Sequence, residues 1–195
     1  MSEERSLLPG QKDPRHLPEI TSTRRVHEGA IVGLSVDEIE LDGGRIVSRE
    51  VLSHPGAVVV AALDAEDCLY LVDQYRHPAR RYLLELPAGC LEIGEEPLET
   101  AKRELREEVG LEAADWSHIG TFYSSPGFAD EILYAFLARD LTAVGTDPDE
   151  DEDLGLVRYP LGTLLAELDR IQDAKTLATL LLVAEKTGLL PIGGK

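Results

Sequence analysis

Residues 89–111 read GCLEIGEEPLETAKRELREEVGL and combine a short helix with a dense set of acidic side chains. Pro97 suits the first turn of a helix, where its missing N–H has no intrahelical partner to lose. Gly110 suits the position just after a helix end. Between them, apolar residues recur every three or four positions, as in a helix that packs on a core: Leu98, Ala101, Leu105 and Val109. The stretch therefore predicts a helix from Pro97 to Val109 with one buried face.

Three glutamates of this helix, Glu104, Glu107 and Glu108, lie at relative positions i, i+3 and i+4 and so share a face. Two interpretations remain open. The face is either a solvated surface partly neutralised by Arg103 and Arg106, or a cluster of hard oxygen ligands for Mg²⁺ or Mn²⁺. A dication would offset the repulsion between carboxylates held this close together.

The spacing of the fixed residues favours the metal interpretation. Gly89 is followed after five residues by Glu95, and seven further residues lead to Arg103-Glu104-Leu105-x-Glu107-Glu108-x-Gly110-Leu111. This pattern closely resembles the signature of the Nudix hydrolases at each of its fixed positions. The resemblance implies a loop–helix–loop segment that holds divalent cations against a diphosphate.

The resemblance also implies roles for individual residues. It assigns two or more ions of Mg²⁺ or Mn²⁺ to the following ligands: Glu104, Glu108, the nearby Glu107 and the backbone carbonyl of Ala88. Arg103 and Glu95 would form a supporting ion pair that orients the helix, and Gly89 would lie against the substrate.

The composition limits which partners the protein can have. The chain of 195 residues has 19 Lys and Arg against 37 Asp and Glu, a net charge of −18. Such a surface repels nucleic acid and anionic membranes, so we expect neither as a partner. It would repel a nucleotide substrate too, unless metal ions or local cations attract it. A basic cluster is present after the second predicted core strand: Arg76, His77, Arg80 and Arg81.

The length suits one good core with a small appendage. No apolar run is long enough to span a membrane, and residues 1–10 lack the apolar region of a signal peptide. Cys68 and Cys90 suggest no disulfide framework. We therefore expect a cytoplasmic protein.

The order of elements predicts an N-terminal β unit followed by a catalytic domain. Residues 1–20 are rich in proline and charge and predict a flexible arm. Residues 21–54 predict an antiparallel β unit with strands at 25–34, 36–41 and 46–52 and a hairpin turn at Asp42-Gly43-Gly44. Residues 55–195 form the predicted Nudix domain.

Within that domain, strands are predicted at 57–63, 68–74, 82–86, 116–123, 131–137 and 156–159, and helices at 161–168 and 174–186. Strands around a central helix, with further helices at the end, predict an α/β fold: an α/β/α sandwich on a mixed sheet.

A polar loop over residues 139–153 ends in Asp149-Glu150-Asp151-Glu152-Asp153. Such acidic runs are usually solvated, but hydrolysis of a diphosphate needs a base to deprotonate water. By the resemblance, the base matches Glu150 or Glu152, with Glu150 preferred and Glu107 as the alternative on the helix.

A second loop narrows the resemblance to one subgroup. Ser125-Pro126-Gly127 alone indicates only a turn. Pro126, however, follows Gly110 by sixteen residues, which resembles the ADP-ribose pyrophosphatases of the Nudix family. In that subgroup the residue that matches Glu131 lies near the terminal ribose of the substrate.

The same resemblance implies further contacts with the substrate. Arg76 would bind phosphate, because a guanidinium offers paired donors. Arg49 and Glu50 would reach adenine or phosphate, often of the neighbouring subunit, since the subgroup is typically a homodimer with exchanged N-terminal β units and shared active sites. Residues 1–68 contain no Phe, Tyr or Trp, so His27, an apolar side chain or Tyr75 must contact adenine instead.

Taken together, the sequence predicts metal-dependent hydrolysis of ADP-ribose to AMP and ribose 5-phosphate. The alternatives are another nucleoside diphosphate sugar, a dinucleotide, or a non-catalytic sensor of ADP-ribose. A nucleic-acid cap hydrolase disagrees with the acidic surface.

Overall fold

The computed structural model describes residues 17–145 and 154–189, and the chain divides after Ser53 into two compact units. The first unit is an antiparallel sheet of β1 (Glu19–Glu28), β2 (Gly33–Leu41) and β3 (Arg45–Ser53) in that order. The antiparallel β unit and its hairpin turn are confirmed. β1 begins two residues inside the predicted arm, and residues 1–16 lie outside the described part.

The predicted strand over residues 25–34 is wrong because it runs through a turn. The Gly29 N–H donates to the carbonyl of Val32 at 2.9 Å, which separates β1 from β2. β-branched residues on both sides of the turn concealed this break in the sequence pattern.

The second unit is built on a mixed seven-stranded sheet. Its main order is β10-β5-β4-β9-β8, with β6 paired to β5 and β7 paired to β4. β4 and β9 are parallel and the other pairs are antiparallel. The bounds are as follows: β4 (Ala57–Leu63), β5 (Cys68–Arg76), β6 (Arg81–Glu85), β7 (Ala88–Cys90), β8 (Leu111–Tyr123), β9 (Ile132–Ala143) and β10 (Leu154–Pro160).

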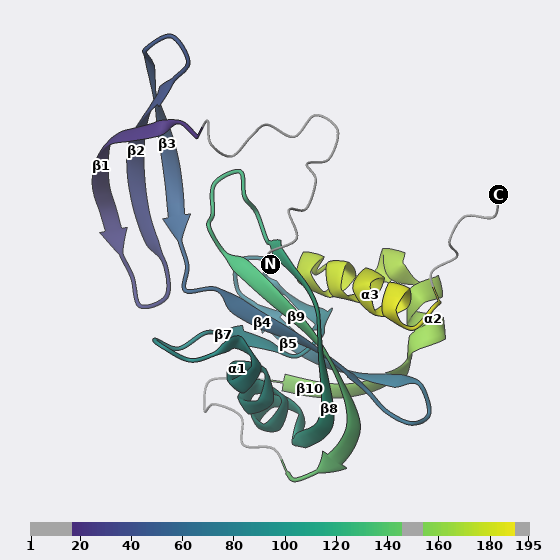
Figure 1. Cartoon of the computed structure of the whole chain (residues 1–195). Coiled ribbons are helices and arrows are strands. Elements are labelled where there is room, and N and C mark those ends of the chain that lie inside the picture. Colours follow the sequence, from purple (N-terminus) through teal and green to yellow (C-terminus); the bar gives the residue numbers. More distant parts are fainter. Residues whose placement is uncertain (1–16, 146–153, 190–195) are drawn as a thin grey trace, which may run out of the picture. The chain divides into compact units, whose positions relative to one another are not determined.

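Helices cover both faces of this sheet, which confirms the predicted sandwich (Figure 1). α1 (Pro97–Glu104) continues into the short helix η2 (Leu105–Val109) on one face. α2 (Leu161–Ala166), the turn η3 (Leu168–Arg170) and α3 (Ala174–Lys186) cover the other face.

β4 forms the centre of the core because all seven of its residues are buried. Val58, Val60 and Ala62 pack toward α1, while Val59 and Ala61 pack toward α2 and α3. Full burial of a valine side chain contributes roughly 1.5–3 kcal/mol, so this strand holds the two layers together. The continuous apolar run that predicted a buried strand is explained by this two-sided packing.

Two strands are longer than predicted. β8 begins at Leu111, directly after the helix, and β9 continues to Ala143. The predicted loop over residues 139–153 therefore begins too early. Polar residues on the exposed end of a two-stranded ribbon gave the pattern of a loop. The later predicted helix over 161–168 is α2 plus part of η3, and Gly188 follows α3 in the left-handed conformation expected of a helix end (φ 74°).

Candidate active site

The motif helix runs from Pro97 to Val109, as predicted, but its last turn has π-helical hydrogen bonding. Ala101, Leu105 and Val109 are buried against the sheet. The helix ends at Gly110, whose φ of 70° is left-handed and suits glycine. π turns inside helices occur often at functional sites, and this one contains both Glu107 and Glu108.

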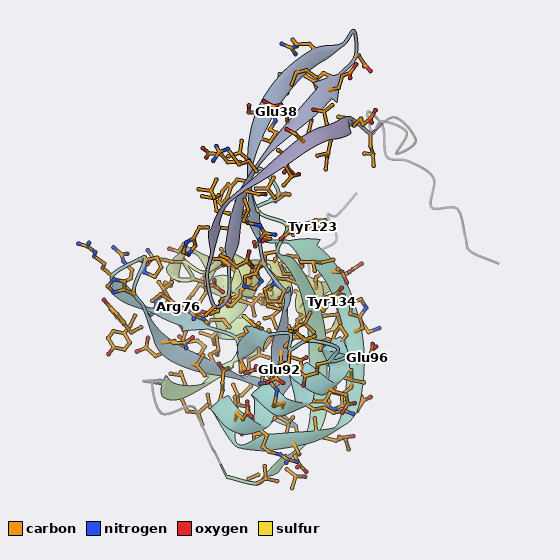
Figure 2. All side chains as sticks on the ribbon, turned by 90° about the vertical axis from the view of Figure 1, so that its left-hand side faces the viewer. Glu38, Arg76, Glu92, Glu96, Tyr123 and Tyr134 are labelled. Carbon is orange, nitrogen blue, oxygen red and sulfur yellow. The ribbon has the colours of Figure 1, made fainter. Side chains whose placement is uncertain are left out.

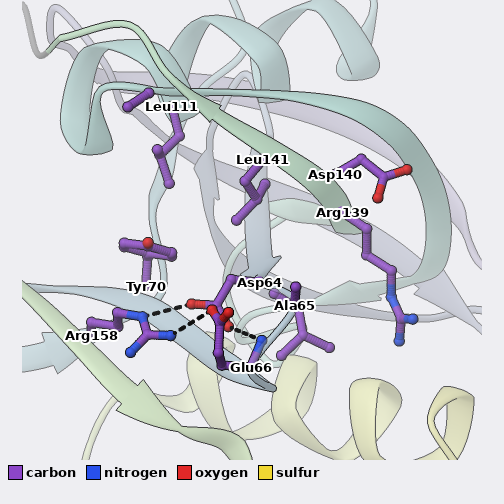
Figure 3. A pocket seen from close by; sticks show the side chains of 11 residues that line it. Asp64, Ala65, Glu66, Tyr70, Leu111, Arg139, Asp140, Leu141 and Arg158 are labelled. Carbon is purple, nitrogen blue, oxygen red and sulfur yellow. Dashed lines mark hydrogen bonds and ion pairs between the residues drawn. The ribbon is translucent and has the colours of Figure 1, made fainter.

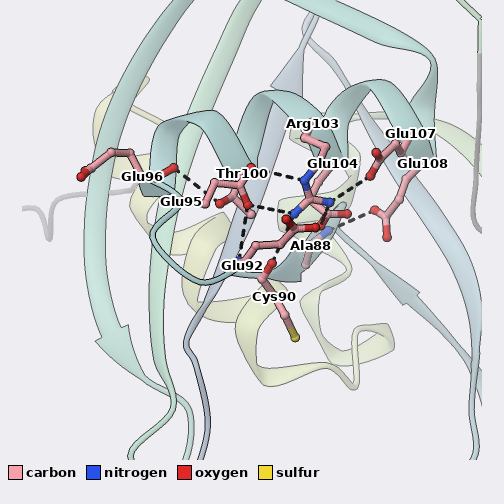
Figure 4. Close-up of polar contacts among 10 residues, drawn as sticks. All are labelled: Ala88, Cys90, Glu92, Glu95, Glu96, Thr100, Arg103, Glu104, Glu107 and Glu108. Atoms are coloured by element: carbon pink, nitrogen blue, oxygen red, sulfur yellow. Dashed lines mark hydrogen bonds and ion pairs between the residues drawn. The ribbon is translucent and has the colours of Figure 1, made fainter. Parts of the chain in front are cut away.

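Arg103 binds three of the motif's carboxylates at once (Figure 4). Its Nη1 donates to Glu104 at 2.7 Å and to Glu107 at 2.9 Å. Its Nε and Nη2 donate to the two oxygens of Glu95 at 3.3 and 3.2 Å, and Nη2 also donates to the carbonyl of Cys90 at 3.3 Å. One guanidinium therefore ties the motif helix to the loop before it.

Charge explains why this arrangement is stable. Burial by itself would lower the pKa of Arg103, but the hydrogen bonds with Glu95 and Glu107 and the charge of Glu104 raise it well above its usual value. The same hydrogen bond holds the pKa of Glu95 below its usual value. Arg103 is thus permanently charged and offsets the repulsion among the glutamates.

Glu104 and Glu108 lie against the backbone of β7. They are 8% and 5% exposed, and Glu108 accepts from the N–H of Ala88 at 3.1 Å. Gly89 leaves room for Glu104, because a Cβ at residue 89 would lie 1.8 Å from the Glu104 Oε1. The spacing of glycine and glutamate in the motif therefore reflects direct contact between them.

The donor set of this face fits a hard divalent cation. Glu104, Glu107 and Glu108 offer carboxylate oxygens beside the backbone of residue 88, and such oxygens are the preferred ligands of Mg²⁺ and Mn²⁺. In the described residues, no three His, Cys, Asp or Glu side chains converge on one point where a metal ion could bind. Arg103 holds two of the three glutamates, so a shared ion would require these hydrogen bonds to be exchanged.

A cleft of about 330 Å³ adjoins this face and collects residues from several elements. Four predicted site residues line it: Arg76, Ala88, Gly89 and Glu131. Arg76, the last residue of β5 (Figure 2), donates from Nε and Nη2 to the two oxygens of Glu85 at 3.0 and 2.8 Å. This hydrogen bond raises the pKa of Arg76, as do the nearby charges of Glu108 and Asp173.

The cleft also contains residues to which the sequence assigned no role in the site. His54 lies between Glu131, whose Oε1 is 3.8 Å from the His54 Nδ1, and Cys90, whose Sγ is 3.6 Å from Nε2. Burial raises the pKa of the Cys90 thiol, and the charges of Glu131 and Glu104 add to this. Ser124, Asp173 and Lys175 complete the polar lining. Cys68 and Cys90 are both free, as expected.

The remaining predicted residues lie elsewhere. Pro126 is exposed, in a loop where the Ser124 N–H donates to the Glu131 carbonyl at 3.1 Å, and it does not line the cleft. Arg49 and Glu50 are exposed on β3 of the first unit, and the Arg49 Nη1 donates to the carbonyl of Ser48. Glu150 and Glu152 lie outside the described residues.

The aromatic residue suggested for adenine lies on the hairpin that joins β5 and β6. Tyr75 is partly exposed, with its ring centre 5.5 Å from that of Tyr82 and 6.2 Å from that of His77. His27 is exposed on β1.

A larger pocket of about 670 Å³ lies at the other end of β4, and Leu111 is the one motif residue that lines it (Figure 3). Its Arg158 donates to Asp64 at 2.6 Å and to Glu66 at 3.0 Å, so its charge is neutralised locally. Asp64 also accepts from the N–H groups of Glu66 and Cys68 and shapes the β4–β5 turn. We assign these contacts to the turn and place the candidate active site at the motif helix.

The carboxylate-bearing helix, the glycine beneath it and the mixed sheet behind them form a loop–helix–loop site whose donors suit a divalent cation. The chain belongs to the NUDIX domain family, whose model matches residues 52–180. In the part of the chain that the structure describes, no helix is both long and apolar enough to cross a membrane.

Similar proteins cover most of the chain. An ADP-ribose pyrophosphatase of Bacillus subtilis is 42% identical over 156 residues, which covers 78% of this chain and 84% of that protein. An ADP-ribose pyrophosphatase of Mycobacterium tuberculosis is 44% identical over 146 residues, covering 73% and 70%. The crystal structure of an ADP compounds hydrolase superimposes with a TM-score of 0.77 at 26% identity, covering 90% of this chain and 97% of that one.

Proposed function

We propose that the protein is a divalent-metal-dependent pyrophosphohydrolase that converts ADP-ribose and water to AMP and ribose 5-phosphate. The observation that carries this proposal is the pair of buried carboxylates, Glu104 and Glu108, held against residues 88–89 beside a cleft that Arg76 lines. The names of two relatives above 40% identity support the choice of ADP-ribose.

Glu104, Glu107 and Glu108, with the carbonyl of Ala88, would hold two or more ions of Mg²⁺ or Mn²⁺. When bound, these cations supply positive charge that offsets the charge of the diphosphate in the transition state. Arg103 and Glu95 act in support, because their ion pair fixes the helix against the preceding loop.

The cleft residues would bind the substrate. Arg76 would contact a phosphate and Gly89 would let the substrate approach the backbone, while Glu131 would bind the terminal ribose. Pro126 would shape the loop that carries Glu131 to the cleft. All of these residues except Pro126 line the same cleft, which supports the assignment.

Glu150 or Glu152 would act as the base that takes a proton from the attacking water, and Glu107 is the alternative. Support comes from the ends of the segment that contains them. Val144 N donates to the carbonyl of Gly110, at the end of the motif helix, and Leu154 pairs with Gln74, two residues before Arg76. Residues 146–153 thus connect two elements of the candidate site.

We further propose a cytoplasmic homodimer in which Arg49 and Glu50 of one chain serve the active site of the other. The first unit supports this arrangement because only Gly33 is buried within its strands, and Ile20, Val26 and Ile46 are exposed. A three-stranded sheet without a buried face gains stability when another surface covers it.

The test is a substrate panel assayed with Mg²⁺ and with Mn²⁺. ADP-ribose should give the highest kcat/KM, at least roughly tenfold above other nucleoside diphosphate sugars, dinucleoside polyphosphates and NADH. The products should be AMP and ribose 5-phosphate, and a chelator should abolish turnover. Preference for another compound would replace the substrate, and tight binding of ADP-ribose without turnover would indicate a sensor.

Two variants of the motif helix test whether the activity measured in this panel comes from the assigned site. Glu108→Gln should lower kcat by about a thousandfold or more, since it removes a carboxylate proposed to hold a cation. Glu99→Gln is the matched control, because Glu99 is an exposed residue of the same helix that pairs only with Lys102 in the described structure. Equal activity of both variants would contradict the assigned site.

A further inference from the structure

Glu85 is a buried carboxylate that the proposed mechanism leaves without a role. It ends β6, and its side chain is 1% exposed. A buried carboxylate is strongly unfavourable unless cations and hydrogen bonds compensate it. Two cations from different elements do so here.

The first cation, Arg76 on β5, meets Glu85 side-on through two hydrogen bonds of 3.0 and 2.8 Å. The second, Lys175 in the first turn of α3, donates from Nζ to the Glu85 Oε2. The Lys175 Nζ also lies 3.1 Å from Asp173, which caps α3 by accepting from the Thr176 N–H. Glu85 therefore joins the end of β5 to the start of α3.

Both cations retain donors after these bonds are counted. A guanidinium has five N–H groups and an ammonium has three. Within residues 17–145 and 154–189, the Nη1 of Arg76 donates to no other group, and Lys175 bonds only to Glu85 and Asp173. Arg76 and Lys175 both line the cleft beside Ala88 and Gly89, whereas Glu85 lies behind them.

We propose that Glu85 is a positioning residue for the substrate: it holds Arg76 and Lys175 side by side and directs their remaining N–H groups at the diphosphate. This makes Lys175 a second phosphate-binding residue. The inference rests on the proposed function, because it assumes that a nucleoside diphosphate occupies this cleft.

Charge and positioning predict opposite effects of Glu85→Gln on the binding of an anionic substrate, which makes the role of Glu85 testable. Arg76 and Lys175 together with Glu85 and Asp173 have no net charge, and replacing Glu85 by glutamine leaves a net positive charge. If charge dominated, an anionic substrate would bind the variant more tightly. If positioning dominates, the variant binds it more weakly, because glutamine accepts through only one oxygen and no longer fixes the guanidinium plane.

The experiment compares Glu85→Gln with the wild-type protein on whichever compound of the panel is hydrolysed best. We expect KM to rise at least about tenfold while kcat stays within about threefold. This combination indicates the loss of an interaction that stabilises the ground state and the transition state equally. An unchanged or lower KM would overturn the proposal. Asp64→Asn is the matched control, because it removes a carboxylate from an arginine pair in the β4–β5 turn. It should leave KM unchanged even where it lowers the melting temperature.

A double-mutant cycle separates positioning from a general loss of structure. In an Arg76→Met background, Glu85→Gln should raise KM much less than it does alone, since one of the two groups that it positions is gone. Additive effects would contradict the proposal. If Glu85→Gln does not fold, Lys175→Met carries the test: KM should rise severalfold and Lys175→Arg should restore most of it.

Calorimetry in the presence of a chelator separates the proposed role of Glu85 from the proposed substrate, ADP-ribose. Binding of ADP-ribose without turnover should weaken at least about tenfold in Glu85→Gln. If the panel shows no hydrolysis of ADP-ribose, the proposed substrate fails, and inorganic pyrophosphate then probes the two cations directly. Equal affinity of both proteins for pyrophosphate would overturn the role of Glu85.

Discussion

Arg103 shows how one side chain organises the candidate site. Its five N–H groups reach three carboxylates and one backbone carbonyl, so one side chain holds Glu104 and Glu107 of the motif helix close together. Lysine, with three donors on a single nitrogen, could not reproduce these contacts. The arginine of the motif therefore preserves the shape of an acidic surface that would otherwise repel itself.

Gly89 gives the sharpest prediction at the scale of a residue. In Gly89→Ala, the new methyl group would lie 1.8 Å from the Glu104 Oε1 and 2.0 Å from its Cδ, so the Glu104 carboxylate must move. We expect kcat to fall at least about a hundredfold, because Glu104 would no longer lie in place to hold a cation. Steady-state kinetics with a melting curve would measure this.

Gly162→Ala is the matched control for that variant. A Cβ at residue 162 meets nothing within 4 Å, and the residue lies in α2, away from the cleft. Its activity should stay within about twofold of the wild type, and a helical alanine should not destabilise the fold. Full activity of Gly89→Ala would show that Glu104 is not needed where the structure places it.

At the scale of elements, the motif helix could be predicted because its signal is local. Periodic apolar residues predicted the buried face, Pro97 and Gly110 predicted the ends, and the structure confirms these features. The π turn could not be predicted, because no residue type selects π over α hydrogen bonding. β7 was also missed, since a strand of three residues has no periodicity to detect.

The cleft was predicted only in part because its residues come from distant elements. Arg76, Gly89 and Glu131 lie in recognisable motifs. No role could be assigned to Lys175 from the sequence, because its partner Glu85 lies 90 residues away. Glu85 itself did leave a signal, as a glutamate between leucines in the predicted strand over 82–86, because charged residues are rarely buried without partners.

The segment that joins β9 to β10 tests the identity of the base. Glu150→Gln should lower kcat by about a hundredfold or more with KM within about threefold, because general bases contribute factors of this size. The acidic limb of its pH–rate profile should change as well. Asp149→Asn is the control from the same segment and should remain active.

Comparison with two further variants decides between the candidate bases. If Glu152→Gln loses activity and Glu150→Gln does not, the base is Glu152 and not Glu150. If only Glu107→Gln is impaired, the base belongs to the motif helix, and residues 146–153 have no part in deprotonating water.

At the scale of the whole molecule, a net charge of −18 and a phosphate substrate are compatible because N–H donors of two cations face the cleft, although Glu85 and Asp173 balance their charge. Arg76 and Lys175 line the cleft, while Arg158 at the other pocket is neutralised by Asp64 and Glu66. Electrostatic attraction of this kind weakens with ionic strength, so salt affects association with substrate more than it affects folding.

The proposed sharing of active sites between two chains makes a quantitative prediction for mixed dimers. Arg49→Ala and Glu108→Gln should each be poorly active alone. A heterodimer would contain one site with both residues intact and one with neither. After random exchange of subunits, half of the dimers are mixed, so about a quarter of the wild-type activity should return.

Light scattering would first establish that the protein is a dimer. Recovery of no activity from dimers that have exchanged subunits would show that each site is complete within one chain. Substitution of the exposed Ile20 and Val26 by lysine should shift the protein toward monomers if the first unit forms the interface.

The central position of β4 has a consequence for how the protein opens. β7, which carries Ala88 and Gly89, pairs with the first three residues of β4, and both apolar clusters meet on that strand. Neither layer can separate from the sheet without exposing β4. Local fluctuations that free the motif helix are therefore coupled to global unfolding, and amide protons of β4 and β7 should exchange with solvent through the same rare event.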